Sequence, residues 1–384
     1  MADDYVLEIP EQITIEVSPK RVPQAAKKPW PAGTRIISAD SHLIEGDYWH
    51  EGFPEHIKDQ APRMTFQDGM FDFRIGDKHM TPPDLALHLC RSMECTPGLS
   101  DIPARLVDLD IEGVEKELIF PQRLFGLFMF GDMQNREEVF GLYNEGIARR
   151  CAEAPGRLYA AMVPNYWDMS KARESVERCQ ALGARALMVP LKPGKNAEGR
   201  SIHYNASEMD ALYEAIADSG IPLTFHIGEA IPAAMPGAAG ISFVTQTQGF
   251  RHQWSQLTFS GVFDRFPKLK ALFVEGGLSW IPAMLHDADL AYTHFRTSMN
   301  PQLQHPPSWY WRQHCYATFM TDPTGLSLLD RIGPETCMWS SDYPHQESTL
   351  GYTRSSIDAV FKATSVENAQ KILGETALEL FDMH

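Results

Sequence analysis

Residues 35–42 read RIISADSH, a short apolar run that ends in polar side chains. Ile36 and Ile37 indicate a buried strand, and Asp40 and His42 follow at its carboxyl end. Because side chains two residues apart on a strand point to the same face, Asp40 and His42 are expected to lie side by side. The stretch therefore predicts a strand that delivers a carboxylate and an imidazole to one site.

Further apolar runs follow the first, and each has a length typical of a buried strand. The eight runs span Arg35 to Ala39, Glu117 to Phe120, Leu158 to Val163, Ala184 to Val189, Pro222 to Phe225, Leu269 to Val274, Cys315 to Met320 and Cys337 to Ser340. Segments between them, whose apolar residues recur at three and four, predict helices. The clearest are Arg136 to Cys151, Met169 to Leu182, Ser207 to Ser219 and Leu278 to Phe295. This alternation predicts an α/β fold, a single (β/α)8 barrel of the TIM type.

The chain is expected to consist of a short arm and one catalytic domain. Residues 1–33 combine an alternating stretch with a basic, proline- and alanine-rich segment, and they predict an N-terminal arm and linker. Residues 34–384 are expected to form the barrel, with an insertion at residues 43–111. The insertion is rich in aromatic residues, methionine and proline, and we expect a lid or substrate wall over the barrel mouth. A surface excursion without function fits it equally well.

Charge and hydropathy exclude several classes of function. The formal charge of −16 comes from 50 acidic and 34 basic residues spread along the chain, without the basic clusters that nucleic acids or anionic membranes attract. The first residues, MADDYVLEIPEQ, lack the basic start and apolar stretch of a secretory signal. Apolar runs also fall short of the roughly 20 residues that span a bilayer. We therefore expect a cytoplasmic protein that binds neither nucleic acid nor membrane.

The six cysteines give no sign of a structural framework. They lack a Cys-x-x-Cys pair and zinc-finger spacing, so neither disulfides nor a structural zinc site is indicated. The closest pair, Cys90 and Cys95, is interpreted as ordinary helix and loop residues in preference to metal ligands.

Polar residues also end three later strands. His226 ends the fifth run and is followed by Glu229, Glu275 ends the sixth before Gly-Gly, and Asp342 follows the eighth. The active sites of such barrels lie at the carboxyl ends of the strands. Taken singly, each residue fits a structural role, such as a helix cap or a loop hydrogen bond. Their joint placement with Asp40 and His42 predicts a metal site.

The order of these motifs resembles the amidohydrolase superfamily, in particular its branch of aminocarboxymuconate-semialdehyde decarboxylase-like proteins. The resemblance runs from about Ile36 to the carboxyl terminus, where residues 367–374 look like the closing helix of that branch. It implies that His226 is a metal ligand and that Asp342 is a ligand or a proton-transfer group. The first-strand ligands implied in the same way are Asp40 and His42.

Three features depart from the family pattern. Asp40 stands at the first position of the usual first-strand His-x-His pair, although a carboxylate there also resembles decarboxylases of this branch. Glu275 occupies the sixth-strand position at which these decarboxylases and hydrolases resemble one another in having a histidine. The fourth strand ends Met188-Val189-Pro190, without the lysine or glutamate that bridges two metals in dinuclear members. Lys192 follows two residues later and is interpreted as a solvated loop lysine.

Other polar residues are spare candidates for the site. Glu45 and His345 are expected to form hydrogen bonds to ligands in preference to binding the metal directly, and Glu229 is a further candidate of this kind. Arg123 fits either a substrate carboxylate or one of the many acidic residues. The surrounding segments 120–130 and 230–250 offer an apolar pocket for an acyl or terpenoid-like body, or packing residues of the core and lid.

The ligand chemistry favours an oxidative hypothesis. Two imidazoles with three carboxylates suit iron or manganese at least as well as zinc. One or two irons would then activate O₂ to hydroxylate an apolar carbon of a carboxylic acid or its coenzyme A thioester, similar to the di-iron monooxygenase of platensimycin and platencin biosynthesis. The proposed ligands are Asp40, His42, His226, Glu275 and Asp342. An external reductant is required, because no glycine fingerprint for a flavin or nicotinamide follows any strand.

The alternative is the usual chemistry of the family. A metal-dependent hydrolase or non-oxidative decarboxylase would act on a carboxylate or acyl substrate, with Asp342 or Glu275 as general acid or base. A barrel that binds a ligand without catalysis is disfavoured, because gathering carboxylates and imidazoles in an interior without metal costs free energy. Finally, Trp280, Trp309 and Trp311 are consistent with the interface of a homodimer.

Overall fold

The computed structural model describes residues 5–8, 14–17, 22–25, 29–67, 70–79, 96–130, 135–229 and 236–384. Eight strands lie in one sheet in chain order, and neighbouring strands pair in parallel. They are β3 (Ile37–His42), β7 (Lys116–Phe120), β8 (Leu158–Met162), β9 (Ala184–Met188), β10 (Leu223–His226), β11 (Ala271–Val274), β12 (Cys315–Phe319) and β13 (Cys337–Trp339). The predicted (β/α)8 barrel is confirmed.

The sheet closes on itself just beyond its last strand. The backbone N–H of His42 donates to the carbonyl of Tyr343 at 2.8 Å, and the N–H of Asp342 donates to the carbonyl of Asp40 at 3.0 Å. A single parallel bridge between Ser41 and Tyr343 accompanies these bonds. The seam therefore brings the ends of the first and last strands together, with Asp342 beside the Asp40–His42 pair.

The eight predicted runs coincide with the eight strands, and the largest difference is at the first. The sequence predicted Arg35 to Ala39, whereas β3 extends to His42. Ser41 and His42 stay in the strand because they pair with Ile119 and Phe120 of β7. The polar residues that follow the apolar run in the sequence thus belong to the strand itself.

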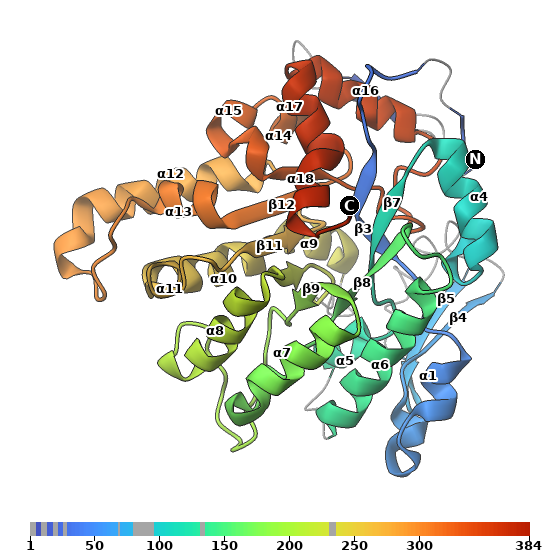
Figure 1. Ribbon diagram of the computed structural model, residues 1–384, viewed down its shortest axis with the longest axis horizontal. Coiled ribbons are helices and arrows are strands. Elements are labelled where there is room, and N and C mark those ends of the chain that lie inside the picture. The colour runs from blue at the N-terminus through green and yellow to red at the C-terminus, as the bar shows by residue number, and fades with distance from the viewer. Residues whose placement is uncertain are drawn as a thin grey trace.

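Helices surround the barrel (Figure 1). They are α4 (Ile102–Glu112), α5 (Phe125–Phe130), α6 (Arg136–Cys151), α7 (Ala172–Ala181), α8 (Asp210–Ser219), α9 (Ala238–Thr245), α10 (Gln248–Phe259), α11 (Val262–Arg265), α12 (Trp280–Phe295), α13 (Pro307–His314), α14 (Pro323–Leu326), α15 (Leu329–Ile332), α16 (Thr353–Ala363), α17 (Val366–Gln370) and α18 (Thr376–Leu380). The predicted helix over 136–151 is α6. Its acidic first turn and basic last turn complement the helix dipole.

The other three predicted helices also appear, with changed starts. Short 3₁₀ turns at Met169–Lys171 and Ser207–Met209 precede α7 and α8, and α12 begins two residues later than predicted. The first turn has a local cause, because the Asp168 side chain accepts the backbone N–H of Ser170 at 3.1 Å.

The segment between β3 and β7 carries small elements as well as a barrel helix. It contains α1 (Asp47–Gly52), a 3₁₀ turn (Glu55–Gln60), β4 (Arg63–Gln67), β5 (Met70–Ile75), β6 (Lys78–His79), a 3₁₀ turn (Pro97–Leu99) and α4. β4, β5 and β6 form an antiparallel sheet. Cys90 and Cys95 lie outside the described residues, and the role of the insertion as a lid stays a prediction. In the N-terminal region, β1 (Tyr5–Glu8) pairs with β2 (Thr14–Val17).

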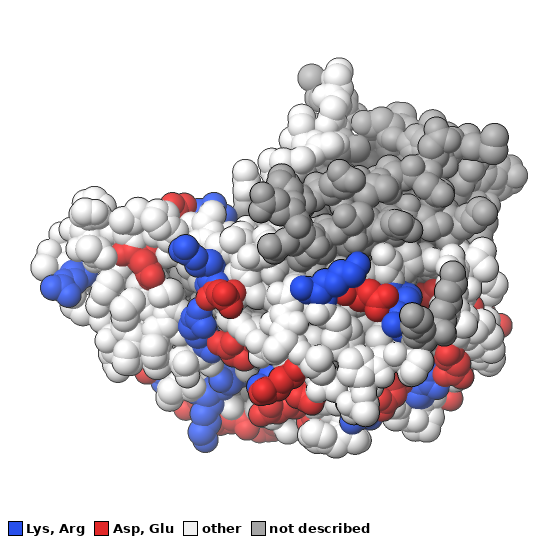
Figure 2. Space-filling model, turned by 90° about the horizontal axis from the view of Figure 1, so that it is seen from above, with Lys and Arg blue, Asp and Glu red and all other residues white. Residues whose placement is uncertain are grey.

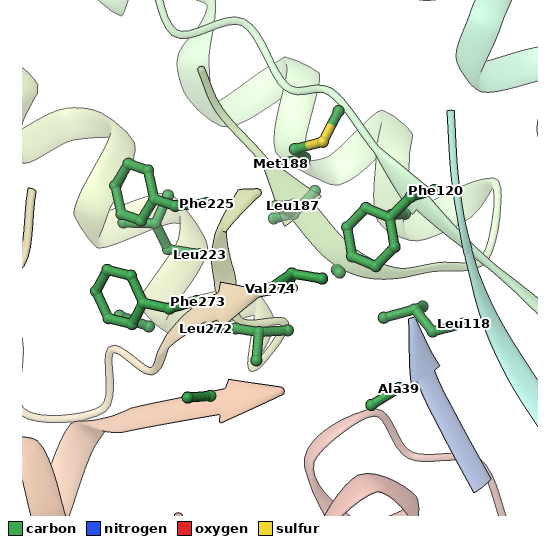
Figure 3. Close-up of a cluster of buried hydrophobic side chains, with 14 of the residues drawn as sticks. Ala39, Leu118, Phe120, Leu187, Met188, Leu223, Phe225, Leu272, Phe273 and Val274 are labelled. Atoms are coloured by element: carbon green, nitrogen blue, oxygen red, sulfur yellow. The ribbon is translucent and has the colours of Figure 1, made fainter. Parts of the chain in front are cut away.

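Aromatic residues bind the helices to the sheet. Phe225 and Phe273, from neighbouring strands, stack with ring centroids 5.7 Å apart (Figure 3). Trp280 of α12 and Trp311 of α13 pack on Phe273, at 5.9 and 5.8 Å. Burying one such ring contributes about 1.5–3 kcal/mol. These two tryptophans are core residues, so the interface interpretation is wrong for them, and only Trp309 is exposed, at 38%.

Surface charge follows the sequence expectation on the face shown in Figure 2. Acidic and basic side chains are interspersed there among neutral residues. Elsewhere, exposed ion pairs join helices, such as Arg173 of α7 with Glu214 and Asp218 of α8. Of the helices in the described ranges, none combines the length and apolar character that crossing a membrane requires.

Candidate metal centre

The polar residues at the strand ends converge on one place. The first group of residues with ligand atoms within 4.8 Å of one another is Asp40, His42, His226 and Glu275. The second group, defined in the same way, is His42, Glu275, Asp342 and His345. The structure thus brings together the five residues that the sequence singled out as ligands, and it adds His345 to them.

Both strand-borne imidazoles are held in one orientation by backbone carbonyls. Nδ1 of His42 lies 2.8 Å from the carbonyl oxygen of Pro121, and Nδ1 of His226 lies 2.8 Å from that of Ile227. With Nδ1–H donating, Nε2 of each ring faces Asp40 Oδ1, at 3.6 Å from His42 and 3.3 Å from His226. A neutral ring tied in this way presents its free nitrogen to a metal.

Two carboxylates carry oxygens that the protein itself does not satisfy. Within the described part of the chain, Asp40 Oδ2 and Asp342 Oδ2 are buried and have no hydrogen-bond partner. Burying such a charged oxygen without a partner is costly, and a cation between the carboxylates removes that cost. The donor set of imidazole nitrogens and carboxylate oxygens therefore fits a divalent cation, with manganese, iron and zinc all suited to it.

The backbone is strained where two of these carboxylates leave their strands. Glu275 has φ = 70° and Asp342 has φ = 53°, in the left-handed region that side chains other than glycine rarely adopt. Such a residue costs on the order of 1–3 kcal/mol and persists where its surroundings hold it, commonly at functional sites. The hydroxyl of Thr318 accepts the N–H of Glu275 at 2.7 Å and helps to hold it.

His345 belongs to the centre rather than to its surroundings. Its Nδ1 lies 3.1 Å from Asp342 Oδ1 and 3.9 Å from Glu275 Oε1, and its ring stacks on His42 with centroids 4.0 Å apart. Its Nε2 lies 2.8 Å from Oε1 of Gln122. Sequence reasoning missed Gln122, because its only signal is its place just after the second strand.

Burial and charge shift the acidity of these groups. Burial, then the negative charge of Asp342, raises the pKa of Glu275 to about 8. Burial opposes ionisation of Asp342, but His345 and His42 hold the pKa of Asp342 below its usual value. Burial alone would lower the pKa of His226, but Asp40 and then Glu275 raise it to about 9. The protein without a cation thus compensates its carboxylates with protons.

One wall of the centre is apolar. Phe120 of β7 and Phe125 of α5 lie against His226, with ring centroids 4.8 and 4.7 Å away. Phe128 packs on Phe125 at 6.3 Å. Phe250, in the other segment expected to line a pocket, instead packs on the core residue Phe273 at 5.4 Å. Residues 230–235 of that segment lie outside the described residues.

Glu45 and Arg123 contact the loop beside the centre. The Glu45 carboxylate accepts the backbone N–H groups of Gln122, Arg123 and Leu124, at 3.2, 2.7 and 3.0 Å. The Arg123 guanidinium donates to the Glu45 carbonyl. Neither residue is in the two groups of candidate ligands.

Glu229 links the ends of two strands. It accepts the backbone N–H of Leu191 at 2.6 Å and of Lys192 at 2.9 Å, both beyond β9. Burial, opposed by these two bonds, raises the pKa of Glu229 to about 7. Glu229 lies outside the two groups of candidate ligands.

Histidines and carboxylates gathered at the strand ends of a (β/α)8 barrel define the class of metal-dependent barrel enzymes. Residues 77–383 match the family model described as amidohydrolase. The chain belongs to this family, and it is a metalloenzyme of the amidohydrolase superfamily that uses a divalent metal.

Solved structures share the fold at low sequence identity. An amidohydrolase from Mycobacterium avium subsp. paratuberculosis K-10 is 19% identical, with a TM-score of 0.75, over 91% of this chain and 100% of its own. The 5-carboxyvanillate decarboxylase from Sphingomonas paucimobilis is 21% identical, with a TM-score of 0.65, over 91% and 99%. The dihydroxybenzoic acid decarboxylase from Polaromonas sp. JS666, solved with manganese and 2-nitroresorcinol, is 17% identical, with a TM-score of 0.64, over 91% and 97%.

Proposed function

We propose that the protein is a metal-dependent, non-oxidative decarboxylase of a small unsaturated or aromatic carboxylate. The observation that carries the proposal is the first group of the metal centre, in which two oriented imidazoles and two carboxylates converge within 4.8 Å. Similar structures that are named decarboxylases, one of them solved with manganese, support this choice among the reactions of the family.

Asp40, His42, His226 and Glu275 would hold the cation. Manganese is the first choice, with zinc and iron as alternatives, because carboxylate and imidazole donors suit all three. When bound, the cation supplies a positive charge that holds the substrate carboxylate and withdraws electrons from it.

His345 and Asp342 are proposed to move the proton. Decarboxylation breaks the bond to the carboxyl carbon, releases CO₂ and leaves an electron pair that takes up one proton. His345 holds a proton at Nδ1, 3.1 Å from Asp342 Oδ1, and its side chain is 14% exposed, so solvent can return the proton after turnover. Asp342 orients the ring and stabilises its charged form. Glu275 is proposed as a ligand, because its carboxylate lies in both groups of candidate ligands.

The apolar wall indicates the body of the substrate. Phe120 and Phe125 lie against the His226 ring, and flat apolar groups pack well on such rings. In a conjugated acid the carbon that bears the carboxylate can take up the proton first, and the electron pair of the bond to CO₂ then restores the conjugated system as CO₂ leaves. An aromatic or unsaturated acid satisfies both requirements.

The oxidative hypothesis is not carried further. Sequence reasoning favoured an iron-dependent monooxygenase, but the decarboxylases among the similar structures support the alternative better. The centre itself does not choose iron, because its donors suit manganese equally well.

The test is CO₂ release by the manganese-loaded protein, in the absence of oxygen, from a panel of hydroxylated aromatic and unsaturated carboxylic acids. We expect one CO₂ for each acid consumed, and an activity loss of at least 100-fold in Asp40→Asn and His345→Ala. Dependence of turnover on O₂ and a reductant, with about two irons per chain as purified, would instead establish the oxygenase.

A further inference from the structure

One loop controls the orientation of two imidazoles in the centre. Residues 121–124 follow β7, and the carbonyl of Pro121 lies 2.8 Å from Nδ1 of His42. The side-chain oxygen of Gln122 lies 2.8 Å from Nε2 of His345. Each contact occupies the ring nitrogen that faces away from the carboxylates, so the other nitrogen faces them. The position of this loop therefore determines which nitrogen of each ring faces the carboxylates of the centre.

The loop is itself held by a buried carboxylate. Glu45 is 2% exposed and lies three residues after His42, in the stretch that joins β3 to α1. Its two oxygens accept three successive backbone N–H groups, those of residues 122, 123 and 124. The Arg123 guanidinium donates back to the Glu45 carbonyl, so the two segments hold each other in both directions. Hydrogen bonds to an ionised group are stronger than those between neutral groups.

The main partners of the Glu45 carboxylate belong to this loop: three backbone N–H groups and the charge of Arg123. Burying a carboxylate is costly unless its oxygens are satisfied, and here backbone N–H groups of the loop satisfy them while the positive charge of Arg123, in the same loop, adds to the attraction. A carboxylate that accepts hydrogen bonds from three neighbouring N–H groups restricts the loop to one conformation, because any shift of the loop lengthens all three bonds together.

We propose that Glu45 is a positioning residue that sets the His42 and His345 rings through the loop at residues 121–124. The part that concerns His42 requires only the metal centre, whereas the importance of His345 for turnover rests on the proposed function. Glu45 touches neither the cation position nor the substrate, and its effect reaches them through Pro121 and Gln122.

A purely structural role for Glu45 is the alternative, and the chain offers a matched control. Glu112 is also a buried glutamate, 5% exposed, and it also accepts two backbone N–H groups, those of Gln24 at 2.9 Å and Gly351 at 3.0 Å. It lies at the end of α4, and these partners do not belong to the loop. Glu112→Gln therefore removes a similar buried charge without disturbing the loop.

The experiment compares Glu45→Gln with Glu112→Gln, using manganese alone as the probe. Free Mn²⁺ is titrated by electron paramagnetic resonance, and the Kd is set beside the Tm of each metal-free variant. We expect the Kd to rise about tenfold or more in Glu45→Gln, as for the loss of other groups that orient metal ligands. In Glu112→Gln the Kd should stay unchanged even where the Tm falls. Equal Kd values in the wild type and Glu45→Gln would overturn the proposal.

A second measurement does not depend on metal binding. Ring ¹⁵N chemical shifts in the metal-free protein report which nitrogen of each histidine carries the proton. In Glu45→Gln we expect the His42 and His345 signals to move toward a mixture of forms, while Glu112→Gln keeps the wild-type shifts. Unchanged signals of both rings in Glu45→Gln would contradict the inference. A wild-type protein that binds no Mn²⁺ would refute the proposed function, and these shifts would still decide the role of Glu45.

If Glu45→Gln does not fold, Gln122→Leu takes its place, because it leaves the carboxylate and the loop backbone intact. The expected result is a changed ¹⁵N shift for His345 alone, with His42 and the Kd for Mn²⁺ close to wild type. A His345 shift that does not respond to Gln122→Leu would show that the loop does not set this ring.

Discussion

The burial of the Asp40 carboxylate is explained by a cation at the centre. One of its oxygens contacts His226 at 3.3 Å, and the other is buried without a hydrogen-bond partner anywhere in the described ranges. An oxygen left in this state is a cost that the fold tolerates only if something else binds there. The same reasoning applies to Asp342, whose Oδ2 is also unpartnered.

Asp40→Asn should therefore reduce Mn²⁺ affinity on the order of 100-fold, since loss of a ligand exceeds the 10–100-fold loss seen for groups that only orient ligands. The change keeps the size of the side chain, so the fold should persist. Isothermal titration with Mn²⁺, and circular dichroism of the variant, measure the two effects. Asp110→Asn is the control, because the Asp110 side chain is 66% exposed and forms an ion pair with Arg157, outside the centre. Wild-type affinity in Asp40→Asn would remove this residue from the centre.

At the scale of elements, buried charges hold strands and helices around the centre. Arg105 of α4 donates from Nε to Glu117 of β7 at 2.6 Å and from Nη1 to the carbonyl of His42 at 2.7 Å. Ser41 of β3 donates to the same glutamate at 2.6 Å. The pair is fully buried, and it ties the helix before β7 to the strand that carries Asp40 and His42.

Arg105→Met should lower the free energy of unfolding by about 3–5 kcal/mol, because it leaves Glu117 charged and buried without its partner. The double variant Arg105→Met with Glu117→Leu should recover much of the loss, since it leaves no unpaired charge. Urea denaturation measures both values. Arg251→Met, at the exposed ion pair with Asp287, is expected to cost less than about 1 kcal/mol. A double variant no more stable than the single one would contradict the argument.

Glu229, which joins the ends of β10 and β9, should make the free energy of unfolding depend on pH. Its pKa is raised to about 7 in the folded protein, so the folded state binds the proton more tightly than the unfolded chain does. The proton on Glu229 contributes on the order of 3 kcal/mol to the free energy of unfolding. This contribution is complete below pH 4.5 and is lost as the pH rises through 7. Glu229→Gln cannot ionise and should lose none of it.

The test is urea denaturation of the metal-free wild type and Glu229→Gln between pH 4.5 and 8.5. The stability of the variant relative to the wild type should increase across this range. Glu198→Gln, at a glutamate 65% exposed, provides the background trend. A difference between wild type and Glu229→Gln that stays constant with pH would show that Glu229 does not titrate in this window.

For the whole molecule, the sequence predicts the barrel better than it predicts the centre. Each strand is a local apolar run, so its existence can be read without knowing its neighbours. The left-handed backbone of Glu275 and Asp342, and the contact of Gln122 with His345, depend on which strands become neighbours in space. The same holds for the seam: β13 has only three residues, and the bonds that close the barrel come after it. Periodicity along the chain carries no information about such pairings.

The seam also makes the closure of the barrel depend on the cation. Two backbone bonds hold it, from the N–H of His42 and from that of Asp342, whereas the junctions of β10 with β11 and of β12 with β13 are regular ladders. A cation held by Asp40, His42 and Glu275 would link the first strand to the sixth, and its positive charge would offset the buried negative charges of Asp40 and Asp342. Saturation at 100 times the Kd should stabilise the fold by about 2.7 kcal/mol.

Hydrogen exchange can locate that stabilisation. We expect Mn²⁺ to slow exchange at the amides of His42 and Asp342 more than at Val189, whose N–H bonds to Thr224 at 2.9 Å within a regular part of the sheet. The reason is that the seam opens locally when the carboxylates repel one another, whereas Val189 exchanges only with wider unfolding. Asp40→Asn should show slow exchange at the seam without metal, since it removes one of the repelling charges. Equal slowing at all three amides would mean that the cation stabilises the barrel only as a whole and that the seam is no weaker than the rest.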